Sequence, residues 1–253
     1  PDRADREAIL AVHVKIKPLA EDINLRVIAE RTPGFSGADL YSLMNEGAIL
    51  AAREGRKSVA QYDLIRSIEK VMLGPERKSH VLSQKEKKIT AYHEAGHALV
   101  ASCLPDADPV HKISIIARGS AGGYTLKLPL DERRLMSRAT FLDDIAMSLG
   151  GYVAEKEIFG DITTGPSNDL EVASNMARQM VTRYGMSTLG PVAFVPSDTV
   201  RGIYNKEYSE VYGEKIDDEV KRIMDDAWNR ARLIVTDKRH VLTAIAEELM
   251  RVE

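Results

Sequence analysis

The feature that most constrains this chain is an H-E-x-x-H pattern made by His93, Glu94 and His97. We predict one helix over residues 83–104, because Ser83 can cap its start and Pro105, which follows it, cannot continue it. The motif lies within this helix. Side chains four residues apart lie on the same helical face, so both imidazoles can bind one metal ion. Glu94 can then hold a water molecule as general base, and zinc is the expected ion.

Gly96 lies between the two histidines, where glycine costs a helix about 1 kcal/mol relative to alanine. This cost suggests that another element packs closely against the helix at that point. The alternative interpretation of the motif is two surface histidines that flank a solvated glutamate.

A catalytic zinc site needs a third protein ligand and an open position for water. Metzincins use a third histidine shortly after the motif, but Val100 and Cys103 stand where their pattern needs glycine and histidine. The remaining candidates are Asp169 at a helix start, Glu155 within a helix, and His111 at a strand start. Each has an ordinary structural alternative, namely a helix cap, a solvated charge and a half-buried strand residue. Spacing does not choose among them.

The composition bounds the class of protein. With 253 residues, 44% of them hydrophobic, and 38 acidic against 35 basic side chains, the chain is typical of a soluble globular protein. A disordered chain and a basic nucleic-acid-binding protein are not expected. The single cysteine, Cys103, cannot form an internal disulfide, which favours a reducing compartment. We expect no signal peptide. No apolar stretch approaches the roughly 20 residues that span a bilayer, so we expect no membrane span in this chain. The start at Pro1 suggests an excised fragment.

Turn and capping signals divide the chain into two parts. Ser36 and Ser58 each precede an acidic or amide side chain by three residues, which marks two helix starts. A polar stretch after Gly74–Pro75 separates an all-helical domain, residues 1–76, from a predominantly helical domain with a small sheet, residues 77–253. Expected helices cover residues 3–13, 23–31, 38–53, 59–72, 83–104, 140–159, 169–184, 206–235 and 237–251, with strands at 111–116 and 124–128.

Several runs of residues resemble one known family. AYHEAGHA at 91–98, PVHKISI at 109–115 and TTGPSNDL at 163–170 resemble the FtsH family of ATP-dependent, membrane-anchored zinc proteases. TPGFSGADL at 32–40 is similar to the helical lid of that family's AAA ATPase module. The resemblance covers nearly the whole chain and implies a mostly α-helical protein, an AAA lid followed by a zincin peptidase domain.

The resemblance also implies roles for single residues. His93 and His97 match zinc ligands of the family, and Asp169 matches the third ligand. Glu94 matches the catalytic base. Glu155 matches a helix glutamate that supports the metal by orienting a ligating histidine.

Two further groups are predicted binding residues. Gly37 and Ala38 match lid positions near the nucleotide in intact family members, although a simple helix start is the better interpretation for this chain. The other group is a predicted strand that contains Gly123, Tyr124, Thr125 and Leu126. We expect an extended peptide substrate to bind along the edge of this strand. The alternative is that the segment is an inner strand of the sheet, without an exposed edge.

These matches predict a zinc endopeptidase that cleaves unfolded polypeptides within an ATP-dependent protease of membrane protein quality control. The chain contains no G-x-x-x-x-G-K-[ST] phosphate loop, so we expect no ATPase activity from it, and ATP with Mg²⁺ only in the intact parent. The resemblance implies a homohexameric parent that is membrane-anchored through segments outside this chain, with this part in the cytoplasm or an equivalent organellar compartment.

Two alternatives belong to other functional classes. The first is a non-enzymatic ring-assembly module with a structural or absent metal, against which Glu94 argues because a structural site needs no base. The second is an ATP-driven unfoldase, which the missing phosphate loop disfavours. No nucleic-acid partner is expected.

Overall fold

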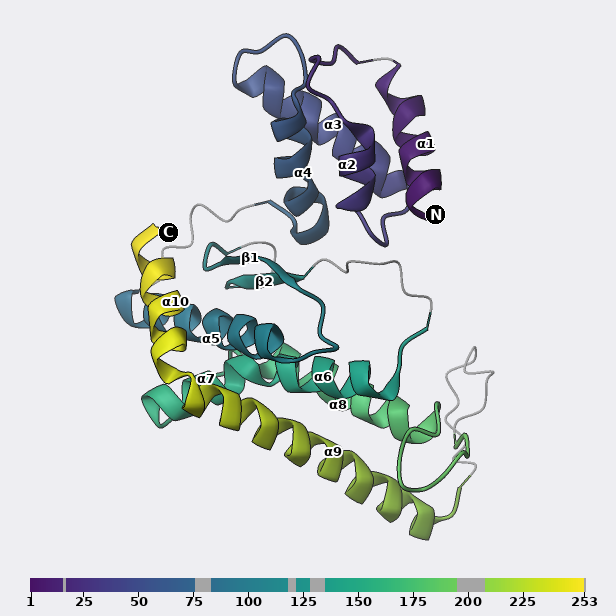
Figure 1. Ribbon diagram of the computed structural model, residues 1–253, viewed down its shortest axis with the longest axis vertical. Helices are drawn as coiled ribbons and strands as arrows, with labels where there is room; N and C mark the ends of the chain where they lie inside the picture. Colours follow the sequence, from purple (N-terminus) through teal and green to yellow (C-terminus); the bar gives the residue numbers. More distant parts are fainter. Residues whose placement is uncertain (16, 76–82, 118–121, 128–134, 195–207, 253) are drawn as a thin grey trace. The chain divides into compact units, whose positions relative to one another are not determined.

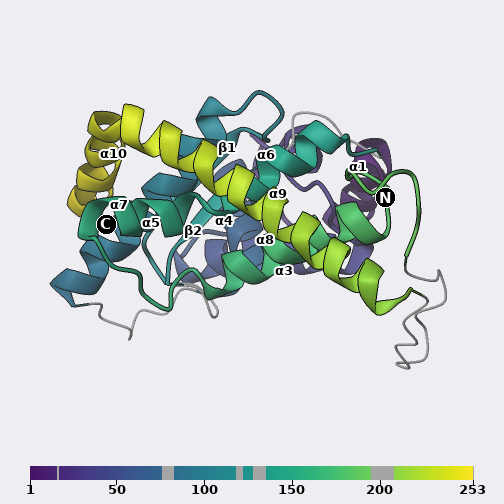
Figure 2. The same cartoon turned by 90° about the horizontal axis from the view of Figure 1, so that it is seen from below.

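The computed structural model describes the chain except for residues 16, 76–82, 118–121, 128–134, 195–207 and 253 (Figures 1 and 2). Its elements form two compact units. Helices dominate both, and the described strands form one two-stranded sheet, so the predicted mostly α-helical fold is confirmed. The predicted domain boundary between residues 76 and 77 lies outside the described residues.

The first unit is a module of short helices whose apolar faces meet in one core. Its helices are α1 (Arg3–Val14), α2 (Leu25–Glu30), α3 (Gly37–Arg53) and α4 (Gln61–Leu73). The fully buried residues of the core include Leu10, Ile28, Leu40, Leu43 and Leu64.

Of the two helix starts that a serine marked in this unit, one is confirmed and one is wrong. Ser36 caps α3, because its hydroxyl oxygen accepts the Asp39 N–H and the Asp39 carboxylate accepts the Ser36 N–H. The start predicted at Ser58 is wrong. Val59 instead pairs with Leu19 in a short parallel bridge, which holds the chain extended, and α4 begins only after it.

The second unit is built around one central helix, α5 (Gln84–Cys103), which Ser83 caps as predicted. Around it lie α6 (Arg138–Ser148), α7 (Gly150–Phe159), α9 (Glu210–Asp237), α10 (Arg239–Val252) and the strands β1 (Val110–Ser114) and β2 (Tyr124–Lys127). Helix α8 (Ser167–Thr182) packs on α6 and α9 (Figures 1 and 2). Every residue of α5 from Ala91 to Ala101 is buried, as expected for a helix surrounded on all sides.

The single helix predicted over residues 140–159 is instead two helices, α6 and α7, which meet at Leu149. The backbone of Gly150 lies directly against Gly96 of α5, where a Cβ atom on Gly150 would come within 2.7 Å of the Gly96 carbonyl oxygen. The close packing predicted at Gly96 is therefore confirmed. The break between α6 and α7 therefore coincides with the point where α7 lies against α5 at backbone distance.

The two predicted strands, β1 and β2, are present and form an antiparallel pair, with Ile113 opposite Thr125. Tyr124 and Leu126 of β2 are buried, and Thr125 between them is partly exposed. In the described part of the chain β2 has β1 as its strand partner and no strand on its second edge. The Lys127 ammonium group forms a 2.8 Å ion pair with Asp144, which ties β2 to α6.

None of the described helices combines the length and apolar character that a membrane span requires.

Glu219 of α9 holds the loop that follows α8. Its buried carboxylate binds the Arg222 guanidinium at 2.7 Å and accepts the Thr188 N–H at 2.9 Å. Hydrogen bonding to Arg222 lowers the pKa of Glu219 to about 2 from 4.5, against the opposing effect of burial. Since the folded-state pKa is lowered, the stabilisation is complete above pH 4.5 and is lost as the pH falls towards 2.

We therefore expect Glu219→Gln to lower the free energy of unfolding at neutral pH by about 1 to 3 kcal/mol. The difference from the wild type should shrink when urea denaturation is repeated near pH 3. Glu214→Gln, an exposed position of the same helix, is the matched control. An equal difference in unfolding free energy between wild type and Glu219→Gln at both pH values would contradict the role of the Glu219 charge.

Candidate metal centre

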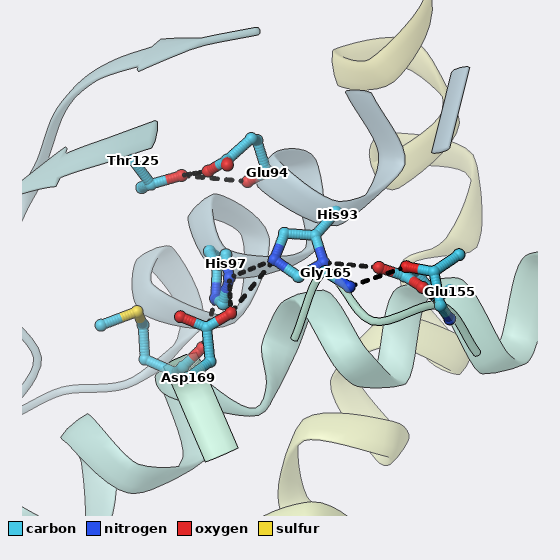
Figure 3. A network of polar contacts seen from close by, with 9 residues as sticks. His93, Glu94, His97, Thr125, Glu155, Gly165 and Asp169 are labelled. Atoms are coloured by element: carbon cyan, nitrogen blue, oxygen red, sulfur yellow. Dashed lines mark hydrogen bonds and ion pairs between the residues drawn. The ribbon is translucent and has the colours of Figure 1, made fainter. Parts of the chain in front are cut away.

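Three side chains from two helices converge in the second unit (Figure 3). His93 and His97 lie one turn apart on α5, and Asp169 lies in the first turn of α8. Both histidines are buried, whereas the Asp169 side chain is 27% exposed. The cluster is therefore set in the core and open to solvent on the side of Asp169.

The distances among the three ligand atoms match a metal site. The Nε2 atoms of His93 and His97 are 3.0 Å apart, and the Asp169 Oδ2 atom lies 3.2 and 3.4 Å from them. Ligands bound tetrahedrally to zinc at 2.0–2.1 Å lie about 3.3 Å from one another. The residues present thus fit a zinc ion with three protein ligands and a fourth position left for water.

The other nitrogen of each imidazole is held by a neighbouring group. The His97 Nδ1–H donates to the carbonyl oxygen of Met147 at 2.9 Å, and the His93 Nδ1–H donates to Glu155 at 2.8 Å. Each bond favours the tautomer whose Nε2 lone pair points into the cluster. Met147 lies at the end of α6 and Glu155 in α7, so these two helices orient both rings.

Glu155 also binds the segment between α7 and α8. Its other carboxylate oxygen accepts the Thr163 N–H at 2.9 Å, in the turn that leads to α8. Within this turn the Gly165 N–H donates to the Thr163 hydroxyl at 3.0 Å. One buried carboxylate therefore connects the His93 ring to the segment that delivers Asp169.

The electrostatics of the cluster favour a cation. Burial lowers the pKa of His93, but hydrogen bonds to Asp169 and Glu155 and the charge of Glu94 outweigh it and raise the pKa to about 9. Burial raises the pKa of Asp169, yet its contacts with the two imidazoles lower the pKa well below its usual range. Three carboxylates around two imidazoles form a negative environment that a divalent metal ion would balance.

Glycines make room for this arrangement. A Cβ atom on Gly96 would lie 2.9 Å from the Gly150 carbonyl carbon, so α5 and α7 touch through their backbones. A Cβ atom on Gly151 would lie 2.5 Å from the His93 Nε2 and Cε1 atoms. The His93 ring consequently occupies the space that a side chain at position 151 would need.

Glu94 lies beside the cluster with its carboxylate buried. The Thr125 hydroxyl of β2 donates to it at 2.7 Å. Burial raises the pKa of Glu94 above 4.5, although the nearby imidazoles lower it. A carboxylate with a raised pKa is a stronger proton acceptor than an ordinary solvated one.

The three candidates that spacing left open lie in different places. Asp169 lies with the two imidazole Nε2 atoms, whereas Glu155 binds the opposite nitrogen of His93. His111 is an exposed residue of β1 and not a member of the cluster. The contacts of Met147, Gly151 and Thr163 with the cluster were not predicted from sequence. The Gly150–Gly151 pair inside a predicted helix was a detectable signal for one of them.

The structure also describes the residues that were predicted to bind nucleotide or substrate. Gly37 and Ala38 are exposed in the first turn of α3. The residues Gly123, Tyr124, Thr125 and Leu126 lead into and form most of β2. Their roles towards nucleotide and substrate stay predictions.

A helix that carries His, Glu and His, facing a carboxylate from a second helix, is the architecture of H-E-x-x-H metallopeptidases. Family comparison agrees with this class: residues 80–253 match the model of peptidase family M41, and residues 22–65 match the AAA+ lid domain. The chain belongs to peptidase family M41.

Curated relatives align along the whole chain. It is 51% identical to ATP-dependent zinc metalloprotease FtsH 1 of Sphaerobacter thermophilus, and 48% and 45% identical to ATP-dependent zinc metalloprotease FtsH of Thermotoga maritima and Bacillus subtilis. All of this chain is covered in each comparison, against 40%, 43% and 41% of the relatives. The chain thus spans about two fifths of their length.

The contact between Gly151 and His93 yields a test of the metal site. We expect Gly151→Ala to displace the His93 ring and weaken metal binding about 10- to 100-fold, the range seen when groups that orient a ligand are lost. Alanine favours a helix over glycine by about 1 kcal/mol, so helix content measured by circular dichroism should not fall. Affinity is measured by titrating zinc against a chromophoric chelator.

Gly213→Ala is the matched control, because it lies in α9 and its added Cβ meets the Tyr208 ring at an ordinary 3.5 Å. Unchanged zinc affinity in Gly151→Ala would show that the ring is not confined there.

Proposed function

We propose that this chain is the lid and peptidase part of an ATP-dependent zinc protease and hydrolyses peptide bonds in its second domain. The observation that carries the proposal is the convergence of three ligand atoms, from His93, His97 and Asp169, at 3.0 to 3.4 Å. The zinc metalloproteases among its relatives support the choice of zinc. The domain limits proposed are 1–76 and 77–253, consistent with family matches at 22–65 and 80–253.

In this proposal His93, His97 and Asp169 hold the zinc ion, which when bound would polarise the scissile carbonyl and lower the pKa of water. Glu94 accepts a proton from the attacking water and passes it to the leaving amine. Its buried position and raised pKa support this role. Glu155 orients His93 and so keeps the Nε2 lone pair directed at the metal.

The proposed substrates are unfolded polypeptides that bind in an extended form along β2. An extended peptide that adds to a strand edge gains main-chain hydrogen bonds without demanding a particular side-chain sequence. The second edge of β2, which lacks a strand partner in the described part of the chain, supports this mode. Low sequence selectivity follows from it.

The remaining proposals concern the intact parent. We propose that it is a membrane-anchored homohexamer that acts in membrane protein quality control, with this part in the cytoplasm or an equivalent organellar compartment. In the parent, Gly37 and Ala38 of the lid would lie near ATP and Mg²⁺. The match of residues 22–65 to the AAA+ lid domain supports this assignment.

Glu94→Gln tests the proton transfer. The variant keeps the shape of the side chain but not its basicity, so hydrolysis of an unstructured peptide should fall at least about 100-fold. Zinc should stay bound, because no ligand has changed. His97→Ala should lose both zinc and activity, since two remaining ligands hold the ion poorly.

Zinc content is measured by atomic absorption and turnover by release of a fluorescent product, without ATP. A zinc-loaded wild-type chain that cleaves no peptide would support the alternative of a non-enzymatic assembly module.

Substitutions of the two carboxylates that contact His93 test the ligand assignment. Asp169→Asn keeps the shape of the side chain but removes the charge of the ligand, so zinc affinity should fall steeply and excess zinc should partly restore activity. Glu155→Gln should be milder, at about 10- to 100-fold lower affinity, as for groups that orient a ligand. Isothermal titration with zinc ranks the two. Tight binding by Asp169→Asn together with metal loss in Glu155→Gln would reverse the assignment.

A further inference from the structure

The carboxylate of Glu94 faces strand β2 with both of its oxygens (Figure 3). The Thr125 hydroxyl donates to Oε2 at 2.7 Å. A Cβ atom on Gly123 would come within 2.9 Å of Oε1, so the backbone at the residue before β2 closely approaches this second oxygen. The strand thus forms one wall of the space that holds the carboxylate.

Thr125 is the one hydrogen-bond donor to this carboxylate among the residues that the structure describes. Glu94 is only 6% exposed, and a buried carboxylate without a donor is costly. A glutamate side chain also has several rotatable bonds, so a single strong hydrogen bond selects among its conformers. The Thr125 hydroxyl therefore has a large influence on where the carboxylate lies.

Thr125 is itself firmly placed. It pairs with Ile113 of β1, and its neighbours Tyr124 and Leu126 are buried. Two residues further on, Lys127 is held by Asp144 of α6. The hydroxyl is consequently presented by a strand that is fixed on one side by β1 and at its end by a helix.

We propose that Thr125 is a positioning residue, whose hydroxyl holds the Glu94 carboxylate in place for proton transfer. The inference rests on the proposed function, and it adds a second role for β2. The strand proposed to receive the extended substrate also positions the general base. Peptide bond and base are then aligned by one element, which reduces the freedom that must be lost before reaction.

Two substitutions of Thr125 test the proposal in the zinc-loaded full chain. Thr125→Val has nearly the same shape without the hydroxyl, and Thr125→Ser keeps the hydroxyl. With an unstructured fluorogenic peptide we expect Thr125→Val to lower kcat about tenfold or more while KM and zinc content stay nearly constant. Thr125→Ser should keep most of kcat. Thr236→Val, the same change at an exposed position of α9, is the control.

A second measurement does not depend on hydrolysis. Unfolding in urea is compared for the zinc-loaded wild type, Thr125→Val, Glu94→Ala and the double variant. If the hydroxyl binds the carboxylate, Thr125→Val should lower the unfolding midpoint clearly in the wild type and much less in the Glu94→Ala background.

The outcomes separate this proposal from the function on which it rests. A kcat unchanged in Thr125→Val, an equal loss in Thr125→Ser, or an effect confined to KM would overturn the positioning role. Additive effects on the unfolding midpoint would overturn the hydrogen bond itself. A third outcome is that the two substitutions have non-additive effects on the unfolding midpoint, but the zinc-loaded wild type cleaves no peptide. This outcome would overturn the proposed function and still support the hydrogen bond from Thr125 to Glu94.

Discussion

The backbone contact between Gly96 of α5 and Gly150 of α7 is the constraint on which the metal centre depends. It places α7 close enough for Glu155 to reach the His93 Nδ1 atom. It also coincides with the break between α6 and α7, where the Met147 carbonyl accepts the His97 Nδ1–H. One close helix crossing therefore orients both imidazoles, and larger side chains at the crossing would separate the groups that aim them.

Partners from the surrounding elements explain how a buried helix tolerates so many polar groups. Two imidazoles and a glutamate lie in the fully buried half of α5, where each unsatisfied polar group would cost stability. Each of them has a partner from a different element, namely α6, α7 or β2. The polar partners of α5 thus come from the surrounding core and leave the Nε2 atoms of both histidines directed at Asp169.

The sequence predicted the features that depend on local rules. The helix around His93 and His97 followed from capping, proline and four-residue spacing, and the hairpin followed from β-branched runs around glycines. The break at Leu149 was missed because the apolar pattern continues across it, and it falls where Gly150 contacts Gly96 in another helix. The start predicted at Ser58 failed for a similar reason, since its neighbour pairs with a residue distant in sequence. No local rule joins Asp169 to the motif, so only the family resemblance singled it out.

The proposed ligands and the proposed base are held by different parts of the fold. His93, His97 and Asp169 are carried by helices of the core and oriented by α6, α7 and the turn at Thr163. Glu94 lies on the same helix, yet its carboxylate is held by β2. Metal affinity should therefore respond to the helix crossing, and proton transfer to the hairpin. Because the hairpin also offers the edge proposed for substrate, a peptide that shifts β2 on binding would change the position of the base without disturbing the metal.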